Sequence, residues 1–181
     1  MNYYFFAASL PALSLDAPPP LTVDAFIALC REHLRADDAE AAEAVLSPDR
    51  DCRHPAVWAW RKREAAVRNA VVRARAHRTQ RDPAPYLHEE AGCEVTIDAA
   101  VSSAFGAATP LEREQALDRL RWALADEAGG LVPFPAVAVM MYGVKLRLAA
   151  RWAQMNDETG EAAASAVVDA APAAAEPLAH R

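Results

Sequence analysis

Two cysteine–histidine pairs are the residues of this sequence whose types and spacing could do chemistry. Two residues separate Cys30 from His33, and one separates Cys52 from His54. Together they could supply the two sulfur and two nitrogen ligands of a tetrahedral zinc site. The spacing fits no established zinc module, however, and a simpler interpretation places Cys30 on the apolar face of one helix and His54 at the cap of the next. We therefore expect no metal ion and no cofactor.

Motifs for enzymatic catalysis are missing. The sequence has no glycine-rich phosphate loop, no Gly-x-Ser-x-Gly elbow and no His-Glu-x-x-His motif. Its acidic pairs, at positions 37–38, 89–90 and 126–127, fall at predicted helix ends or in loops, where solvated charge is the usual explanation. We expect no enzymatic activity.

Charge is distributed unevenly along the chain. Residues 53–81 contain nine basic residues, eight Arg and Lys62, against the single acidic residue Glu64, although the whole chain carries a net charge of −6. Clustered arginines can release counterions from phosphates, so a nucleic-acid-binding protein is one hypothesis. Against it, the arginines surround the predicted helix and do not line one stripe. A helical adaptor docked on an acidic protein surface is another hypothesis.

Composition predicts an all-α multi-helix bundle. Alanine, the best helix former, is abundant, glycine is scarce at 6 residues, and no alternating strand pattern occurs. The three cysteines match no disulfide framework, which favours a reducing cytosolic compartment. The first residues lack the basic region of a secretory signal, and no apolar segment approaches the roughly 20 residues of a membrane span.

The segment 131–156 is the predicted centre of the bundle. It has no charged residue before Lys145, and its apolar residues recur at helical spacing. Pro135 suits the first turn of its helix. The predicted apolar stripe consists of Val137, Met141, Val144, Leu148 and Trp152.

Other helices are predicted from caps and breakers. Thr22 is a candidate N-cap, and Asp37 or Asp38 is expected to cap a short helix that ends before Pro48. Thr109 and Glu112, with Pro between them, form a predicted capping box. The sequence predicts one helix after Thr22 that includes Leu34, and a second, short helix that ends at about Leu46. The later helices are expected from Pro55 to about Thr79, from Glu94 or Thr96 to about Phe105, from Pro110 to Gly129, and from Pro135 to Asn156.

The long Arg-rich helix contains one acidic residue in its apolar stripe. Glu64 lies among Val57, Trp60 and Val67, which recur at helical spacing. A partly buried carboxylate needs a partner, and Arg68 follows at i+4, the favourable order for a helix pair. The sequence therefore predicts a Glu64–Arg68 ion pair.

Proline and glycine after this helix suggest a division into two helical halves. Pro83, Pro85 and Gly92 interrupt the helical pattern. We expect an N-terminal half at 1–82, a C-terminal half at 83–159, and a disordered tail rich in Ala, Pro and Glu at 160–181.

Several patches together resemble a family of small proteins encoded in bacterial operons for V/A-type rotary ATPases, known only as a domain of unknown function. That family is similar to a shortened form of the ATPase's C subunit, whose eukaryotic counterpart is the d subunit. The patches are Tyr3–Pro11 (YYFFAASLP), Trp60-x3-Glu64-x3-Arg68-Asn69, and Leu117–Trp122 (LDRLRW) followed by Pro133-Phe134, Tyr142 and Leu146–Trp152.

The resemblance implies a mechanical function. The C subunit is not catalytic; it lies on the cytoplasmic face of the membrane rotor ring and carries torque to the central stalk. By analogy this chain would be cytoplasmic, peripheral to the inner membrane, with the rotor ring and the central stalk of the V/A-type ATPase as partners. The implied partner-binding residues are Arg61, Arg68, Arg73 and Arg75. The implied structural residues are Trp60, Glu64, Arg68, Trp122, Tyr142 and Trp152.

Overall fold

The computed structural model describes residues 3–88, 94–130, 135–155 and 160. In these ranges the chain forms α-helices and one short 3-10 helix, with no strand, which confirms the all-α prediction. The elements are α1 (Tyr3–Ser9), α2 (Val23–His33), α3 (Ala36–Leu46), α4 (Pro55–Thr79), η1 (Ala84–Tyr86), α5 (Val95–Phe105), α6 (Pro110–Gly130) and α7 (Pro135–Gln154).

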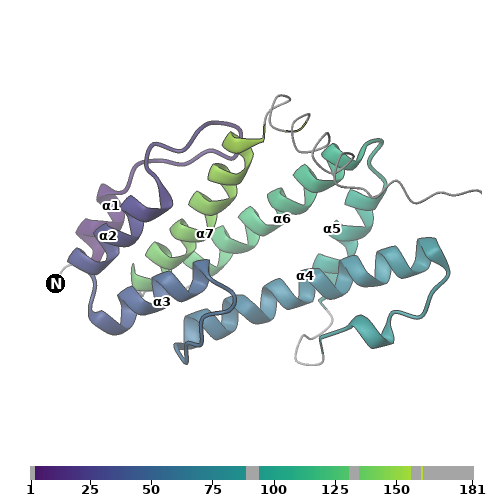
Figure 1. Cartoon of the computed structure of the whole chain (residues 1–181), viewed down its shortest axis with the longest axis horizontal. Coiled ribbons are helices and arrows are strands. Elements are labelled where there is room, and N and C mark those ends of the chain that lie inside the picture. Colours follow the sequence, from purple (N-terminus) through teal and green to yellow (C-terminus); the bar gives the residue numbers. More distant parts are fainter. Residues whose placement is uncertain (1–2, 89–93, 131–134, 156–159, 161–181) are drawn as a thin grey trace, which may run out of the picture.

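Helices α6 and α7 lie side by side at the centre of the molecule, with α4 running along its lower edge in Figure 1. Helices α1, α2 and α3 pack on α7, and α5 contacts both α4 and α6. One hydrophobic core contains buried residues from all seven helices. The division near residue 82 stays a prediction, and the predicted tail lies outside the described residues except for Gly160.

Helix α7 is buried on more than one side. Met141, Val144 and Leu148 of the predicted stripe are buried, and so are Val139 and Leu146, which the stripe does not include. These additional residues face inward because α7 contacts α1, α2, α3 and α6, so a single stripe underestimates its buried surface. Among the described residues, no helix combines the length and the apolar character needed to cross a membrane.

The predicted side-chain caps of α2 and α6 are present. The Thr22 hydroxyl accepts a hydrogen bond from the Ala25 N–H at 3.2 Å. At the start of α6, Thr109 accepts from the Glu112 N–H at 3.1 Å, and the Glu112 carboxylate accepts from the Thr109 N–H at 3.2 Å. Both bonds of the capping box are therefore present.

The predicted cap of α3 was wrong. The helix begins at Ala36, its N-cap is Arg35, and no side chain of that cap accepts a hydrogen bond. Asp38 lies in the first turn, where its charge favours the helix dipole. The Tyr3 hydroxyl reaches this helix start from α1: it accepts from the Arg35 N–H and donates to Asp38, each at 2.8 Å. A residue more than thirty positions away performs the role that local sequence suggested for an aspartate.

We expect Thr109→Ala to lower the free energy of unfolding by about 1 kcal/mol, because the substitution removes the side-chain acceptor for an unpaired N–H of α6. Chemical denaturation followed by circular dichroism measures the change. Ser102→Ala, on the exposed surface of α5, is the control and should change stability by less than about 0.5 kcal/mol. Equal effects of the two substitutions would contradict a stabilising capping box.

Candidate functional site

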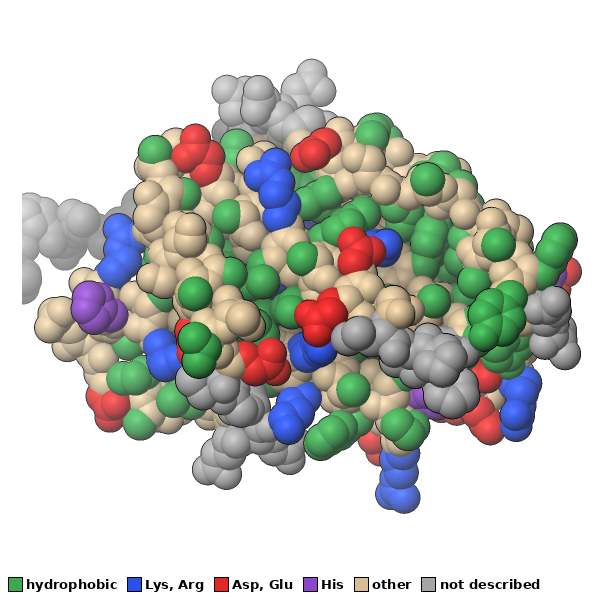
Figure 2. Space-filling view, turned by 180° about the vertical axis from the view of Figure 1, so that it is seen from behind, with side chains coloured by type: hydrophobic (Ala, Val, Ile, Leu, Met, Phe, Trp, Pro, Cys, Tyr) green, Lys and Arg blue, Asp and Glu red, His purple; other side chains and the backbone are tan. Residues whose placement is uncertain are grey.

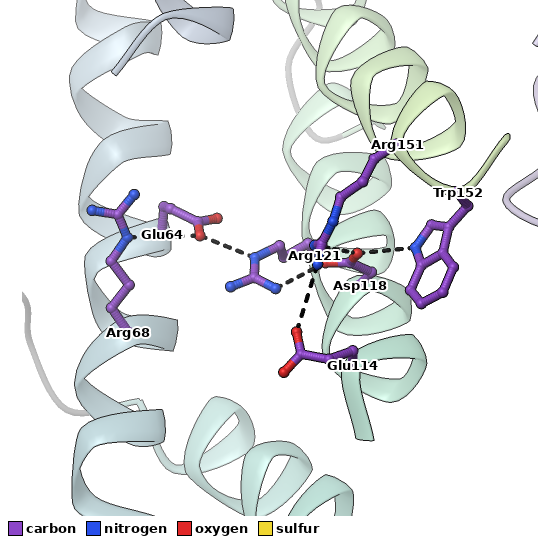
Figure 3. A network of polar contacts seen from close by, with 7 residues as sticks. All are labelled: Glu64, Arg68, Glu114, Asp118, Arg121, Arg151 and Trp152. Carbon is purple, nitrogen blue, oxygen red and sulfur yellow. Dashed lines mark hydrogen bonds and ion pairs between the residues drawn. The ribbon is translucent and has the colours of Figure 1, made fainter. Parts of the chain in front are cut away.

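A buried carboxylate is the centre of the main polar cluster. Asp118, on α6, has no exposed surface. Its Oδ1 accepts from Arg121 Nη1 at 2.9 Å, and its Oδ2 accepts from Arg151 Nη1 at 2.9 Å and from Trp152 Nε1 at 3.0 Å, as Figure 3 shows. Burial of an ion is costly unless it is paired and hydrogen-bonded, and three donors meet that requirement here.

Arg121 extends this cluster to the long helix. Its Nε donates to Glu64 Oε1 at 3.0 Å, so it lies between Glu64 on α4 and Asp118 on α6 (Figure 3). Burial lowers the pKa of Arg121, but Glu64 and Asp118 raise it by more, so the pKa stays above its ordinary value. We name Glu64, Asp118, Arg121, Arg151 and Trp152 the buried ion cluster; it joins α4, α6 and α7.

The predicted Glu64–Arg68 pair is the weaker of two pairs. Arg68 Nε lies 4.0 Å from Glu64 Oε1, and 52% of its side chain is exposed. The closer partner is Arg121, whose side chain is 19% exposed. Arg121 lies closer because α6 packs against α4 at this point, which an i, i+4 rule within one helix cannot reveal.

Arg147 on α7 is a second partly buried cation. Its Nη1 donates to the Leu46 carbonyl at the end of α3. Burial lowers the pKa of Arg147 most, Arg121 and Arg68 lower it further, and Glu64 and Asp118 offset part of this effect. Burial, more than the neighbouring charges, therefore sets the direction in which the pKa of Arg147 is shifted.

A cavity of about 410 Å³ opens beside Arg147, between the end of α3, α4 and α7. We name it the basic hollow. Its apolar wall includes Trp58 and Trp60. Its ionisable lining residues are Arg61, Lys62, Glu64, Arg68, His88 and Arg147.

The four arginines predicted to bind partners have different surroundings. Arg75 is exposed, and its side chain makes no hydrogen bond or ion pair with the described residues. Arg68 is largely exposed, as above. Arg73 forms an ion pair with Asp98 of α5. Arg61 donates through Nη2 to the backbone carbonyls of Ala44, Ser47 and Arg50, at and after the end of α3.

Other basic residues of α4 also have internal partners. Arg63 donates to Glu127 of α6 at 3.0 Å. Figure 2 shows acidic and basic side chains lying next to one another across the face of the molecule opposite to that in Figure 1. Since Arg61, Arg63 and Arg73 are already bonded within the chain, the described part of α4 presents no continuous row of free cations, the feature that a nucleic-acid backbone would require.

The predicted structural aromatics lie in or against the core. Trp60 is buried, at 5% exposure. Trp122 and Tyr142 are partly buried; Lys145 lies over the Trp122 ring at 5.3 Å, and the Tyr142 hydroxyl donates to the Pro11 carbonyl at 3.0 Å. Trp152 is half-buried and not fully buried, because it lies near the end of α7 and turns its N–H toward Asp118.

Three of the four zinc candidates, Cys30, His33 and His54, make structural contacts in the described chain. Cys30 is fully buried on the apolar face of α2, and burial followed by the charge of Glu43 raises its pKa to about 12. His33 packs against the Phe6 ring. His54 caps α4 by accepting from the Ala56 N–H at 3.2 Å, as expected. No group of three or more potential metal ligands occurs among the described residues.

Glu43 on α3 is a buried acid that local reasoning missed. Its carboxylate accepts from Arg31 on α2 and from Arg50 beyond the end of α3. The Arg31 hydrogen bond is the main cause that lowers the Glu43 pKa below its ordinary value of 4.5, and Arg50 adds to it against the opposing effect of burial.

A pH dependence follows from this lowered pKa. A carboxylate whose folded pKa is depressed stabilises the fold above its unfolded pKa, and this stabilisation is lost as pH falls through the folded pKa. We expect Glu43→Gln to be less stable than the wild type near neutral pH, and the difference to shrink below the ordinary value of 4.5. Denaturation series at several pH values test this; a stability difference that does not change with pH would contradict it.

Several residues of the site were missed from sequence, although some signals existed. Asp118 shares the inward face of its helix with Ala125, one heptad later, and is followed at i+3 by Arg121. Asn69 is buried and bonds both the N–H and the carbonyl of His88, which anchors the segment after η1 to α4. No local signal could have paired Asn69 with His88.

Comparisons of the chain with protein-family models, with curated proteins and with solved structures found no match.

Proposed function

We propose that this protein is a non-catalytic peripheral subunit of a bacterial V/A-type ATPase, which couples the membrane rotor ring to the central stalk as the C subunit does. The observation that carries the proposal is that the resembling patches meet in space. The buried ion cluster takes Glu64 from the second patch, Asp118 and Arg121 from the third, and Arg151 and Trp152 from the segment that follows it. The patches that resemble that family thus supply the ion pairs and hydrogen bonds that join α4, α6 and α7 at this cluster.

A part that transmits torque must keep its helices in a fixed relation. Sliding α4 along α6 would separate Glu64 from Arg121, and sliding α7 along α6 would separate Arg151 and Trp152 from Asp118. Breaking a buried ion pair in this way costs several kcal/mol. The first patch is also attached to the body: Tyr3 bonds the start of α3, and the Pro11 carbonyl accepts from Tyr142 of α7. These contacts support a stiff helical body.

In this proposal the protein lies at the cytoplasmic surface of the inner membrane and contacts it through the complex. The exposed Arg68 and Arg75 are the better candidates for contacts with acidic surfaces of neighbouring subunits. Arg61 and Arg73 already have acceptors within the chain, so recruiting them would mean breaking internal bonds.

The proposal is tested by purification from the cell that encodes the protein. A tagged chromosomal copy should co-purify with the rotor ring and central-stalk subunits from solubilised membranes. Charge reversal at the exposed positions, Arg68→Glu with Arg75→Glu, should weaken this recovery while circular dichroism shows a folded protein. Deletion of the gene should impair ATPase assembly or proton-coupled ATP hydrolysis; normal assembly and coupling in the deletion strain would refute the proposal.

A further inference from the structure

The basic hollow holds more cations than acids. Arg61, Lys62, Arg68 and Arg147 line it, and Glu64 is the one acid among its lining residues. Glu64 is already bonded to Arg121, which does not line the hollow, at 3.0 Å. Arg121 therefore compensates the negative charge of Glu64 from outside the hollow, and the residues that line the cavity carry a net positive charge.

One hydrogen-bond donor of a residue that lines this cavity also lacks an acceptor among the described residues. Arg61 Nε is buried without a hydrogen-bond partner among the described residues, which is uncommon for a buried donor. Arg147 is partly buried, and burial is the main cause that lowers its pKa; Glu64 offsets part of this effect, and Arg121 and Arg68 add to it. A bound anion would supply negative charge to a wall lined by four Lys and Arg side chains and one acid.

The remaining lining is apolar, which restricts the class of ligand. Trp58 is 58% exposed, and Trp60, Val45, Pro48 and Ala65 complete the wall. An exposed tryptophan beside arginines is typical of protein-binding surfaces. A free phosphate would use only the cations. A nucleic-acid strand would need cations beyond the hollow, where Arg63 and Arg73 have internal partners.

We propose that the basic hollow is a docking site for an acidic segment of a partner protein, with a carboxylate bound by Lys62, Arg68 and Arg147 and a neighbouring apolar side chain packed on Trp58. The site requires a cation-lined cavity next to an exposed aromatic ring, and α4 and α7 provide both. The inference goes beyond the ATPase proposal and does not depend on it, because it specifies the chemistry of the partner and not its identity.

The test uses the full chain labelled with 5-fluorotryptophan and observed by fluorine NMR. The Trp58 resonance is assigned by its loss in Trp58→Phe. The probe is a short peptide of alternating Glu and Phe, and its matched control has Gln in place of Glu. Because Trp58 lies at the hollow, we expect the Glu peptide to shift its resonance in a saturable way and the Gln peptide to leave it unchanged.

Charge-removing variants locate the bound peptide. Lys62→Gln with Arg68→Gln changes two exposed side chains, so the fold should survive, and the peptide affinity should fall by about tenfold or more. Arg75→Gln removes an exposed arginine of the same helix that does not line the hollow, and it should leave the affinity unchanged.

Several results would overturn the proposal. One is the absence of a Trp58 shift with the Glu peptide, and another is an equal loss of affinity in Arg75→Gln. Binding of inorganic phosphate or oligothymidine as tight as that of the peptide would assign the hollow to a simple anion or to nucleic acid. The double variant Glu89→Gln with Glu90→Gln is also measured without peptide. If its Trp58 resonance differs from that of the wild type, the hollow is assigned to the chain's own acidic pair and not to a partner. The outcome of the peptide experiment does not predict the outcome of the co-purification experiment. Either proposal can therefore be refuted while the other stands.

Discussion

Replacement of Asp118 by alanine is expected to lower the free energy of unfolding by about 3–5 kcal/mol, because it removes a fully buried carboxylate that is the common acceptor of three donors from α6 and α7. Asp118 is fully buried and accepts from Arg121, Arg151 and Trp152. Urea denaturation followed by circular dichroism measures the loss. The control is Asp126→Ala on the same helix: Asp126 pairs with Lys145 but is 52% exposed, so a loss below about 1 kcal/mol is expected.

A second variant separates charge from volume at this position. Asp118→Asn keeps the shape of the side chain but offers one acceptor oxygen to three donors, and its amide group adds donors of its own. Most of the loss seen in Asp118→Ala should therefore remain. A nearly neutral Asp118→Asn would mean that packing, and not ion pairing, explains the effect of Asp118→Ala. A loss in Asp118→Ala no larger than that in Asp126→Ala would contradict the stabilising role of the buried ion cluster.

Phe26→Ala is expected to cost about 3–5 kcal/mol, as is usual when a fully buried aromatic side chain is removed. Phe26 has no exposed surface, and its ring lies 5.5 Å from the Tyr142 ring, between centroids. It packs α2 on α7. The control is Phe5→Ala on α1, where the side chain is 76% exposed, and its effect should stay below about 1 kcal/mol.

Helices α2 and α7 approach each other closely where Phe26 packs against Gly143. A Cβ added at Gly143 would lie 2.7 Å from Phe26 Cε1, closer than real Cβ contacts allow. In the wild type, Gly143→Ala should therefore destabilise the fold by overpacking. The Phe26→Ala variant lacks the ring that this Cβ would meet. In that background Gly143→Ala should raise the free energy of unfolding by up to about 1 kcal/mol, because alanine has a higher helix propensity than glycine. An effect of the same sign in both backgrounds would contradict this packing.

The helices were predictable where their determinants are local. Pro55 and the residues after it predict a helix that ends at Thr79, and the structure has these bounds. The capping box at Thr109 and Glu112 also forms as predicted. Hydrogen bonds within a helix join residues four apart, and caps act over three, so a short window of sequence contains the information.

Pairing of charges was not predictable in the same way. Glu64 has a local candidate in Arg68, yet its nearer partner is Arg121, which is 57 residues away in sequence. Asp118 and Trp152 are 34 residues apart. Local spacing can propose partners on the same helix only, and the choice between them depends on which helix packs against that face.

Sequence by itself determined that the chain is helical, where most of its helices begin and end, and that one long helix is rich in arginine. Tertiary structure alone decided which arginines find acceptors in distant parts of the chain and which residues meet at a cavity: Arg61 caps the end of α3, and Arg147 of α7 joins Arg68 of α4 beside the basic hollow. The physical reason is the distance along the sequence over which each interaction acts. Helix formation is decided by contacts within a few residues, whereas a charge is neutralised by whichever group the packing of distant helices brings within a few ångströms.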